Sequence, residues 1–268
     1  MFEKLKAFTS RLEQIRADFG WRVAADAVLD RAGRATVGLQ VMEVIWLDAS
    51  QVSALSGTDP RFTFRFLRAE EVRRHARDPE LKLSPDLAAR IEAGRDLCYA
   101  ALEGDRLAAY GWYALDSIEG EHNFGVPMSF PADTAYMYNG FTHPDFRGLR
   151  LHGRAMGLAL RAMEYKGVTR LVSTVDWMNH ASLRSCERLG YSRLGRIVTH
   201  AGGLALVVSV PAQATNKGVR FGHLADNRPP LPVTNRTPEG FVLMTPSATI
   251  RAAESVPGAH DEAAVYSS

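Results

Sequence analysis

Residues 138–153, which read YNGFTHPDFRGLRLHG, constrain this chain more than any other segment. The pattern predicts a strand that leads into a turn rich in glycine and arginine and then into the start of a helix. The first amide N–H groups of a helix have no intrahelical partners, and the peptide dipoles leave partial positive charge there. Gly148 and Gly153 permit a tight turn and a close approach. Guanidinium groups suit phosphate, and the turn supplies Arg147, Arg150 and Arg154. The segment is therefore a candidate site for a diphosphate.

Two common nucleotide-binding motifs do not fit this turn. No Gly-Lys-Ser/Thr follows it, as a Walker loop requires, and the spacing G-x-G-x-x-G is missing. A nucleotide-binding protein is the weaker interpretation, because no Ser/Thr or acidic residue that would hold Mg²⁺ follows as expected.

The residues after the turn predict a helix, a strand and a second, capped helix. Residues 151–166 have apolar side chains at helical spacing, and Gly167 is placed to end that helix. Residues 168–175 are rich in β-branched side chains and predict a strand. Asn179 can cap the following helix, which Gly190 ends. One face of that helix is apolar, with Leu183, Cys186 and Leu189.

Two motifs in this order resemble the GNAT family of N-acetyltransferases. HPDFRGLRLHG is similar to the family's acyl-CoA pyrophosphate loop, and NHASLRSCERLGY, residues 179–191, is similar to its second signature. The likeness covers roughly residues 60–210. It implies an α/β (α+β) fold with a mixed, mostly antiparallel central sheet, flanking helices and splayed central strands. It also implies acetyl-CoA or another acyl-CoA as co-substrate, without a metal.

The loop departs from the family pattern at two positions. With Arg147 placed on the family's arginine, Arg150 and His152 stand where glycines are expected. A shift of the pattern to Arg150 instead matches Gly153 and Ala155. We favour the first alignment, because His143-Pro144 then falls where the strand should end.

The resemblance assigns one set of residues to the cofactor. Gly140 interrupts the predicted strand, which is typical of a bulge, and in the family a bulge there turns N–H groups toward the thioester carbonyl. The expected cofactor-binding residues are Phe141, Thr142, His143, Arg147, Gly148, Leu149, Arg150, Leu151, His152, Gly153, Asn179 and Ser182.

The catalytic groups are less sharply indicated. Cys186 stands where many family members have a tyrosine that protonates the departing thiolate, and the alternative is a small buried apolar residue. A base must remove a proton from the amine, and Tyr138 is our candidate on the strand. The other candidates are Asp133, Glu119, Glu121, His122 and His143. Proximity alone accelerates aminolysis, so the reaction does not require a strong base.

The composition of the chain bears on its core, its partners and its compartment. The 268 residues are 46% hydrophobic, which is enough for a full core, and a net charge of +2 does not favour nucleic acid. Cys98 and Cys186 show no metal-ligand spacing, so we expect a reducing cytoplasm. We see no apolar run that would span a bilayer and no signal-peptide pattern at the N-terminus.

We expect three regions along the chain. Residues 1–60 predict an extension with an amphipathic helix at 2–19 and a strand at 37–47, and for that helix packing is favoured over membrane contact. Residues 61–221 predict the acyltransferase domain. Its expected elements are strands at 62–67, 97–102, 107–115, 193–200 and 204–210 and helices at 69–76 and 85–93. The loop at 116–133 is either a candidate substrate lid or an inert surface connection. Residues 222–268 are rich in proline and predict an extended or disordered tail.

These features predict an acyl-CoA-dependent N-acyltransferase that moves acetyl to a primary amine by direct attack. The alternatives are a noncatalytic acyl-CoA-binding scaffold of the same fold and a long-chain N-acyl amino acid synthase. The expected partner is a small-molecule or peptide amine, and a homodimer stays open.

Overall fold

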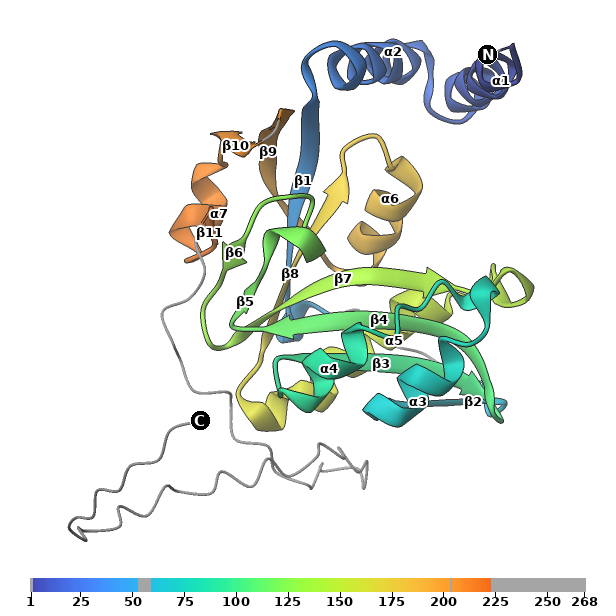
Figure 1. The fold of residues 1–268 in the computed structure, drawn as a ribbon, viewed down its shortest axis with the longest axis vertical. Coiled ribbons are helices and arrows are strands. Elements are labelled where there is room, and N and C mark those ends of the chain that lie inside the picture. Colours follow the sequence, from blue (N-terminus) through green and yellow to red (C-terminus); the bar gives the residue numbers. More distant parts are fainter. Residues whose placement is uncertain (1, 53–58, 203, 223–268) are drawn as a thin grey trace, which may run out of the picture.

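Two sheets organise the molecule, for which a computed structural model describes residues 2–52, 59–202 and 204–222 (Figure 1). The main sheet contains β1 (Leu39–Asp48), β2 (Phe62–Phe66), β3 (Asp96–Glu103), β4 (Arg106–Leu115), β7 (Thr134–Thr142), β8 (Arg170–Asp176), β9 (Ser192–Gly202) and β10 (Leu204–Ser209). Its order is β10-β9-β1-β8-β7-β4-β3-β2. The pair β7 and β8 is parallel and the other neighbouring pairs are antiparallel, so the predicted mixed, mostly antiparallel sheet is confirmed.

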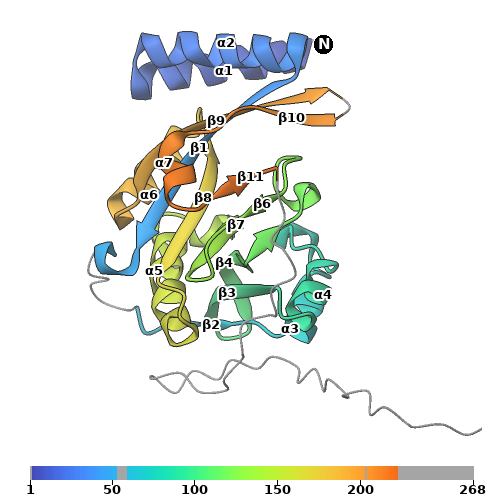
Figure 2. The same cartoon turned by 90° about the vertical axis from the view of Figure 1, so that its left-hand side faces the viewer.

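The described residues form α1 (Phe2–Phe19), α2 (Trp21–Val37), α3 (Ala69–His75), α4 (Leu87–Glu92), α5 (Leu151–Met163), α6 (His180–Leu189) and α7 (Ala212–Asn216). Some of these helices cover the two faces of the main sheet. Figure 2 shows α5 and α6 on one side of the sheet and α3 and α4 on the other. Each side has its own buried core, one around Trp112 and Tyr136 and the other around Met156 and Leu160.

The strand β1 lies inside the main sheet. It pairs with β8 along one edge and with β9 along the other. The boundary that we predicted near residue 60 therefore divides strands of one sheet, and the folded unit includes β1. The predicted helix at 2–19 is present as α1, whereas α2 was not predicted. These two helices pack together beyond the ends of β9 and β10 (Figure 2).

The strands β7 and β8 separate halfway along their length. They pair from Thr134 with Arg170 to Met137 with Ser173, and beyond that point each has a partner on one side alone. The Ser173 hydroxyl donates to the Met137 carbonyl oxygen at 2.7 Å, so a side chain satisfies the backbone where the ladder ends. The predicted splay of the central strands is present.

A bulge lies within β7. Tyr110 of β4 faces Phe141, and Trp112 faces Tyr138, so Asn139 and Gly140 together oppose one residue of β4. Asn139 adopts a φ of 46°, a left-handed conformation that asparagine tolerates better than most residues. This irregularity is where Gly140 predicted one.

The predicted lid at 116–133 is a packed segment. It contains β5 (Ser117–Ile118) and β6 (Met128–Ser129), which join β11 (Arg220–Phe221) in a small second sheet. Several of its side chains are buried, namely Ile118, Val126, Met128 and Phe130. The predicted tail falls, from residue 223 onward, outside the described residues. Within the described part, no helix has both the length and the apolar character needed to cross a membrane.

Candidate active site

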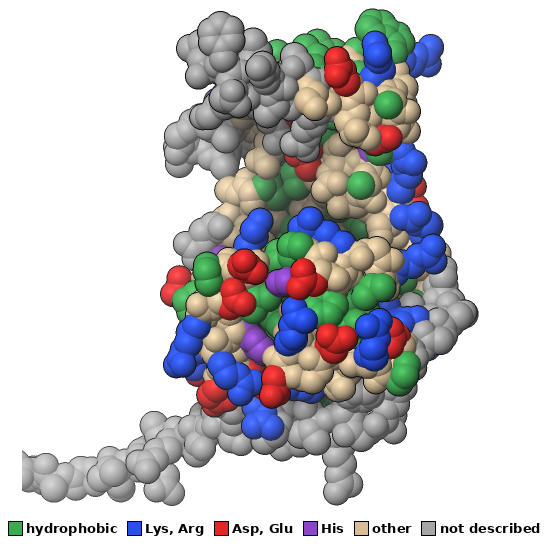
Figure 3. All heavy atoms as spheres, turned by 90° about the vertical axis from the view of Figure 1, so that its right-hand side faces the viewer, with side chains coloured by type: hydrophobic (Ala, Val, Ile, Leu, Met, Phe, Trp, Pro, Cys, Tyr) green, Lys and Arg blue, Asp and Glu red, His purple; other side chains and the backbone are tan. Residues whose placement is uncertain are grey.

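Two cavities meet at the splay between β7 and β8. The larger one, of about 810 Å³, is lined from both faces of the sheet. The smaller one, of about 460 Å³, surrounds the loop before α5. They share wall residues, namely Thr142, Arg147, Gly148, His152 and Ser185. Figure 3 views the side of the molecule where Lys and Arg side chains border a hollow.

Local backbone geometry builds the loop. Phe146 is buried, with its ring edge-on to Phe62 at 5.8 Å between centroids, and it anchors the 3₁₀ turn Pro144–Phe146. Gly148 then adopts a φ of 82°, and Arg150 adopts a φ of 57° as the residue that precedes α5. Arg150 therefore has the left-handed conformation for which glycine is best suited. This supports the alignment that places Arg150 on a family glycine.

The smaller cavity is strongly basic. The guanidinium-bearing residues on its wall are Arg147, Arg150, Arg154 and Arg188. None of the described residues that line it is acidic. The N-terminus of α5 opens on the same space, so main-chain N–H groups and arginines together favour an anion there.

The predicted loop residues contribute in different ways. Leu151 is 2% exposed and belongs to the core, so its contribution to the cavity is its backbone. A β-carbon on Gly153 would meet no atom within 4 Å, and the space that this glycine leaves open is part of the cavity wall. Leu149 is an exposed apolar residue on the rim. Thr142 lines both cavities.

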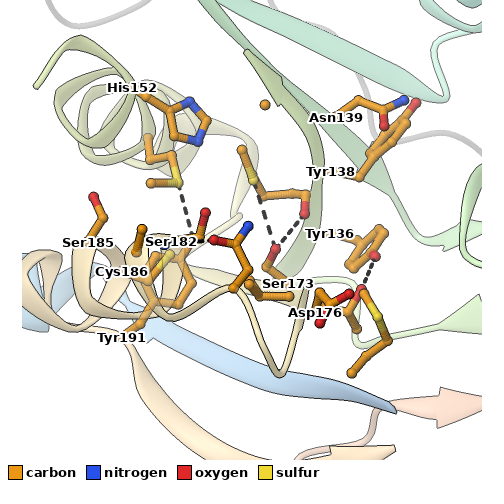
Figure 4. Close-up of a pocket in the computed structure, with 18 of the residues that line it drawn as sticks. Tyr136, Tyr138, Asn139, His152, Ser173, Asp176, Ser182, Ser185, Cys186 and Tyr191 are labelled. Carbon is orange, nitrogen blue, oxygen red and sulfur yellow. Dashed lines mark hydrogen bonds between the residues drawn. The ribbon is translucent and has the colours of Figure 1, made fainter. Parts of the chain in front are cut away.

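His152 occupies the junction of the two cavities. Its ring projects from the first turn of α5 toward β7 (Figure 4), and a β-carbon on Gly140 would lie 2.2 Å from its Cε1 atom. The Nδ1 atom is buried and has no hydrogen-bond partner among the described residues. Burial lowers the pKa of His152 to about 4, against a hydrogen bond with the Tyr110 backbone that raises it. The imidazole is therefore neutral at physiological pH.

The capped helix α6 forms the opposite wall. The Asn179 side chain accepts a hydrogen bond from the Ser182 backbone N–H at 3.2 Å, which confirms the predicted cap. Both residues line the larger cavity. Cys186 lies there too, 8% exposed, and burial raises the pKa of its thiol to about 11.

The Tyr138 side chain lies on the opposite face of the sheet from α5 and α6. Its ring lines the larger cavity, but its hydroxyl donates to Asp96, which Arg90 also binds at 2.6 Å. Burial, with the Asp96 carboxylate next in importance, raises the pKa of Tyr138. The Arg90 guanidinium extends the network to Glu119.

The structure places the remaining predicted candidates away from the cavities or in other contacts. Phe141 stacks on Tyr110 at 5.5 Å, so its side chain belongs to the opposite core. His143 accepts from the Asp145 N–H and lines neither cavity. Asp133 binds Arg170 at 2.5 Å. His122 lines the larger cavity, and the side chain of Glu121 lies outside the described residues.

The sequence over this whole arrangement matches a family model. The model is that of the acetyltransferase (GNAT) family, and it covers residues 63–191, including the loop, the splay and α6. Residues 63–191 form a GNAT acetyltransferase domain.

Several solved structures are similar to part of this chain. A GCN5-related N-acetyltransferase from Kribbella flavida is 12% identical over 62% of this chain and 61% of its own, with a TM-score of 0.41. A GNAT-family acetyltransferase from Colwellia psychrerythraea is 12% identical over 60% and 56%, with a TM-score of 0.43. A tandem GNAT protein from the clavulanic acid biosynthesis pathway is 16% identical over 64% and 58%, with a TM-score of 0.40. The chain thus spans about three fifths of the length of these proteins. No curated protein matches it.

The larger cavity of the GNAT domain has a second half that the sequence did not indicate. Asp176, at the end of β8, lines this half and accepts from the Met178 N–H at 2.9 Å. Met42 of β1 and Phe124 of the packed segment lie on the same wall. The one available signal was a carboxylate at the end of a strand beside the predicted splay.

Proposed function

We propose that this protein is an acyl-CoA-dependent N-acyltransferase that transfers acetyl from acetyl-CoA to a primary amine by direct attack. The observation that carries the proposal is the continuity of a basic cavity at a helix N-terminus with a second cavity that passes through the splayed sheet. A thioester whose diphosphate lies in the first would have its reactive end in the second.

The basic cavity suits the diphosphate of CoA. The first N–H groups of α5, with Arg147 and Arg150, would bind its oxygens. The arm that follows would enter the gap where β7 and β8 no longer pair, because the backbone groups there are available to a ligand.

The bulge on β7 would position the reacting carbonyl. An N–H group at Gly140 or Phe141, aimed at the thioester oxygen, would stabilise the negative charge that develops when the amine attacks. The C–N bond forms, the C–S bond breaks, the thiolate leaves with the electron pair, and the amine loses one proton to a base or to water.

The leaving thiolate does not need Cys186 as an acid. A thiol whose pKa is raised to about 11 holds its proton more tightly than an ordinary thiol does, so transfer to the thiolate of CoA is uphill. We infer that Cys186 forms an apolar wall for the arm, and that the Tyr138 hydroxyl holds Asp96 in place.

Calorimetry with CoA and a thiol-release assay with acetyl-CoA and an amine panel test the proposal together. We expect micromolar CoA binding that Arg147→Gln with Arg150→Gln weakens at least tenfold. The same change at Arg161, an exposed residue in the last turn of α5, is the matched control and should leave affinity unchanged. Absence of CoA binding in the unmodified protein would reject the assignment.

A noncatalytic acyl-CoA-binding protein is the second candidate. The hydroxyl of Tyr138 bound to Asp96 and the raised pKa of Cys186 favour it, because both leave the site without an obvious acid or base. Tight CoA binding with no thiol release on any amine would support this candidate. Release that increases with acyl length would instead indicate a long-chain acyltransferase.

The remaining expectations are part of the proposal. A cytoplasmic location fits two cysteines that are free and buried. A small-molecule or peptide amine as acceptor and a homodimer stay predictions, as does the separation of residues 222–268 from the domain.

A further inference from the structure

The half of the larger cavity that faces away from α5 and α6 has an aromatic and apolar wall. Tyr136 and Tyr138 stack with their rings 4° from parallel and centroids 6.0 Å apart. Met42 and Phe124 are partly buried on the same side of the sheet and also line the cavity. An occupant of this half would therefore contact rings and apolar chains.

The polar atoms of this wall are already bonded within the protein. The Tyr136 hydroxyl donates to Asn123 at 2.6 Å and lies 2.6 Å from the Thr174 hydroxyl. Asn123 in turn donates to the Val126 carbonyl oxygen at 2.8 Å. Since Tyr138 donates to Asp96, both tyrosines offer an occupant their rings rather than their hydroxyls.

Negative charge in the cavity is limited to a single position. Asp176 is the one carboxylate among the described residues that line it. The carboxylates behind the wall, Asp96 and Glu119, are bound to Arg90, and Arg95 also binds Glu119. A molecule with several ammonium groups would leave most of them without a partner, and buried unpaired charge is costly.

We propose that the acceptor is a small monoamine carried on an aromatic or apolar body, with its ring against Phe124 and the two tyrosines and its amine toward Asp176. This inference rests on the proposed acyltransferase function. It excludes polyamines and aminoglycosides as preferred acceptors, because one carboxylate matches one positive charge. The ring gives such an acceptor contacts that a short alkylamine lacks.

Thiol release from acetyl-CoA, measured with three amines, tests the inference. Phenethylamine carries a ring and one charge, butylamine carries one charge without a ring, and spermidine carries several charges. We expect kcat/KM for phenethylamine to exceed that for butylamine at least tenfold and that for spermidine at least a hundredfold. Equal or better turnover of spermidine would overturn the substrate class while leaving the acyltransferase function standing.

Two substitutions locate the effect in this cavity. Phe124→Ala should lower kcat/KM for phenethylamine about tenfold and leave that for butylamine within twofold, because butylamine does not reach the ring. Asp176→Asn should lower both by a similar factor, because both carry the charge. Unchanged CoA affinity by calorimetry shows that each variant is folded. Equal losses for both amines in Phe124→Ala would overturn this placement of the ring. Failure of every amine to release thiol from acetyl-CoA would overturn the proposed function and this inference together.

Discussion

The imidazole of His152 lies directly against the α-carbon of Gly140, where a β-carbon would stand 2.2 Å from Cε1. The contact joins the first turn of α5 to the bulge of β7 at the junction of the two cavities. His152 stands where the family pattern has a glycine, and its ring fits here because Gly140 on the strand has no side chain.

Gly140→Ala should therefore be damaging on its own. No real β-carbon approaches an atom so closely, so either the ring or the strand must move, and overpacking of this kind costs about 1–3 kcal/mol. We expect loss of CoA affinity and a lower denaturation midpoint. The double variant with His152→Gly should recover most of both, because the ring is gone and the other close atom, the flexible end of Met137 at 2.9 Å, can move aside. Equal damage in the single and double variants would show that the histidine is not the cause.

Acid should destabilise the protein partly through His152. Because burial lowers its pKa to about 4, the unfolded chain binds this proton more readily, and the contribution to stability is present above the unfolded pKa near 6.5. It is lost as pH falls from about 6.5 toward 4. His75 and His180, whose pKa values burial also lowers, act in the same direction. Denaturation at several pH values should give a smaller acid loss for His152→Asn than for the unmodified protein, and parallel curves would contradict this.

Arg150→Gly should separate stability from ligand affinity. Glycine relieves the left-handed backbone, which costs an arginine roughly 1 kcal/mol, while the lost guanidinium removes an anion contact. We expect a raised denaturation midpoint together with a CoA affinity lowered about threefold to tenfold. Lys82 has a similar φ of 52° and lines neither cavity. Lys82→Gly should therefore raise the denaturation midpoint and leave CoA affinity unchanged.

The buried contacts among Arg90, Asp96 and Tyr138 should contribute strongly to the free energy of unfolding. Asp96 is 0% exposed, and Asp96→Ala leaves the Arg90 guanidinium without its main partner, which costs about 3–5 kcal/mol. Tyr138→Phe removes one hydrogen bond and should cost about 1–3 kcal/mol. The exposed pair Arg73–Glu92 is the reference, and Glu92→Gln should lower the urea denaturation midpoint far less than either buried change. Similar losses at the two sites would contradict the assignment.

Cys186 should be unreactive and dispensable for the chemical step. Its thiol is protonated at neutral pH because burial raises the pKa to about 11, and the thiolate is the reactive species. We expect slow labelling by iodoacetamide at pH 7.5 and a kcat for Cys186→Ala within about fivefold of the unmodified protein. A hundredfold loss in kcat with unchanged CoA affinity would instead assign it the role of a proton donor.

Local signals explain why much of the domain was predictable from sequence. Gly167, with a φ of 82°, ends the 3₁₀ turn Glu164–Lys166 that follows α5, and Gly190, with a φ of 111°, ends α6. Asn179 caps the start of α6, so each of these boundaries depends on residues within a few positions. Gly140 marked the bulge for the same reason. The helix α2 was missed because its alanines, charges and internal Gly33 give a weak apolar pattern.

The candidate site depends on contacts that sequence order does not reveal. Tyr138 lines the larger cavity, but Asp96, from a distant strand, decides what its hydroxyl binds. Met42 and Phe124 reach the cavity from β1 and the packed segment, so no local pattern indicates them. Asp176 shares the wall with them because β1 and β8 pair at Met42 and Asp176.

The position of β1 also sets the order in which the molecule can assemble during synthesis. Trp46 pairs with Val172 on one side and Ser192 on the other, so the ribosome makes this strand long before either partner. At ordinary elongation rates the delay is on the order of ten seconds, during which a strongly apolar segment has no sheet to join. The helix α2 packs on β1 and precedes it in the chain, so it is the neighbour that emerges first and can shield the strand while the remainder is translated.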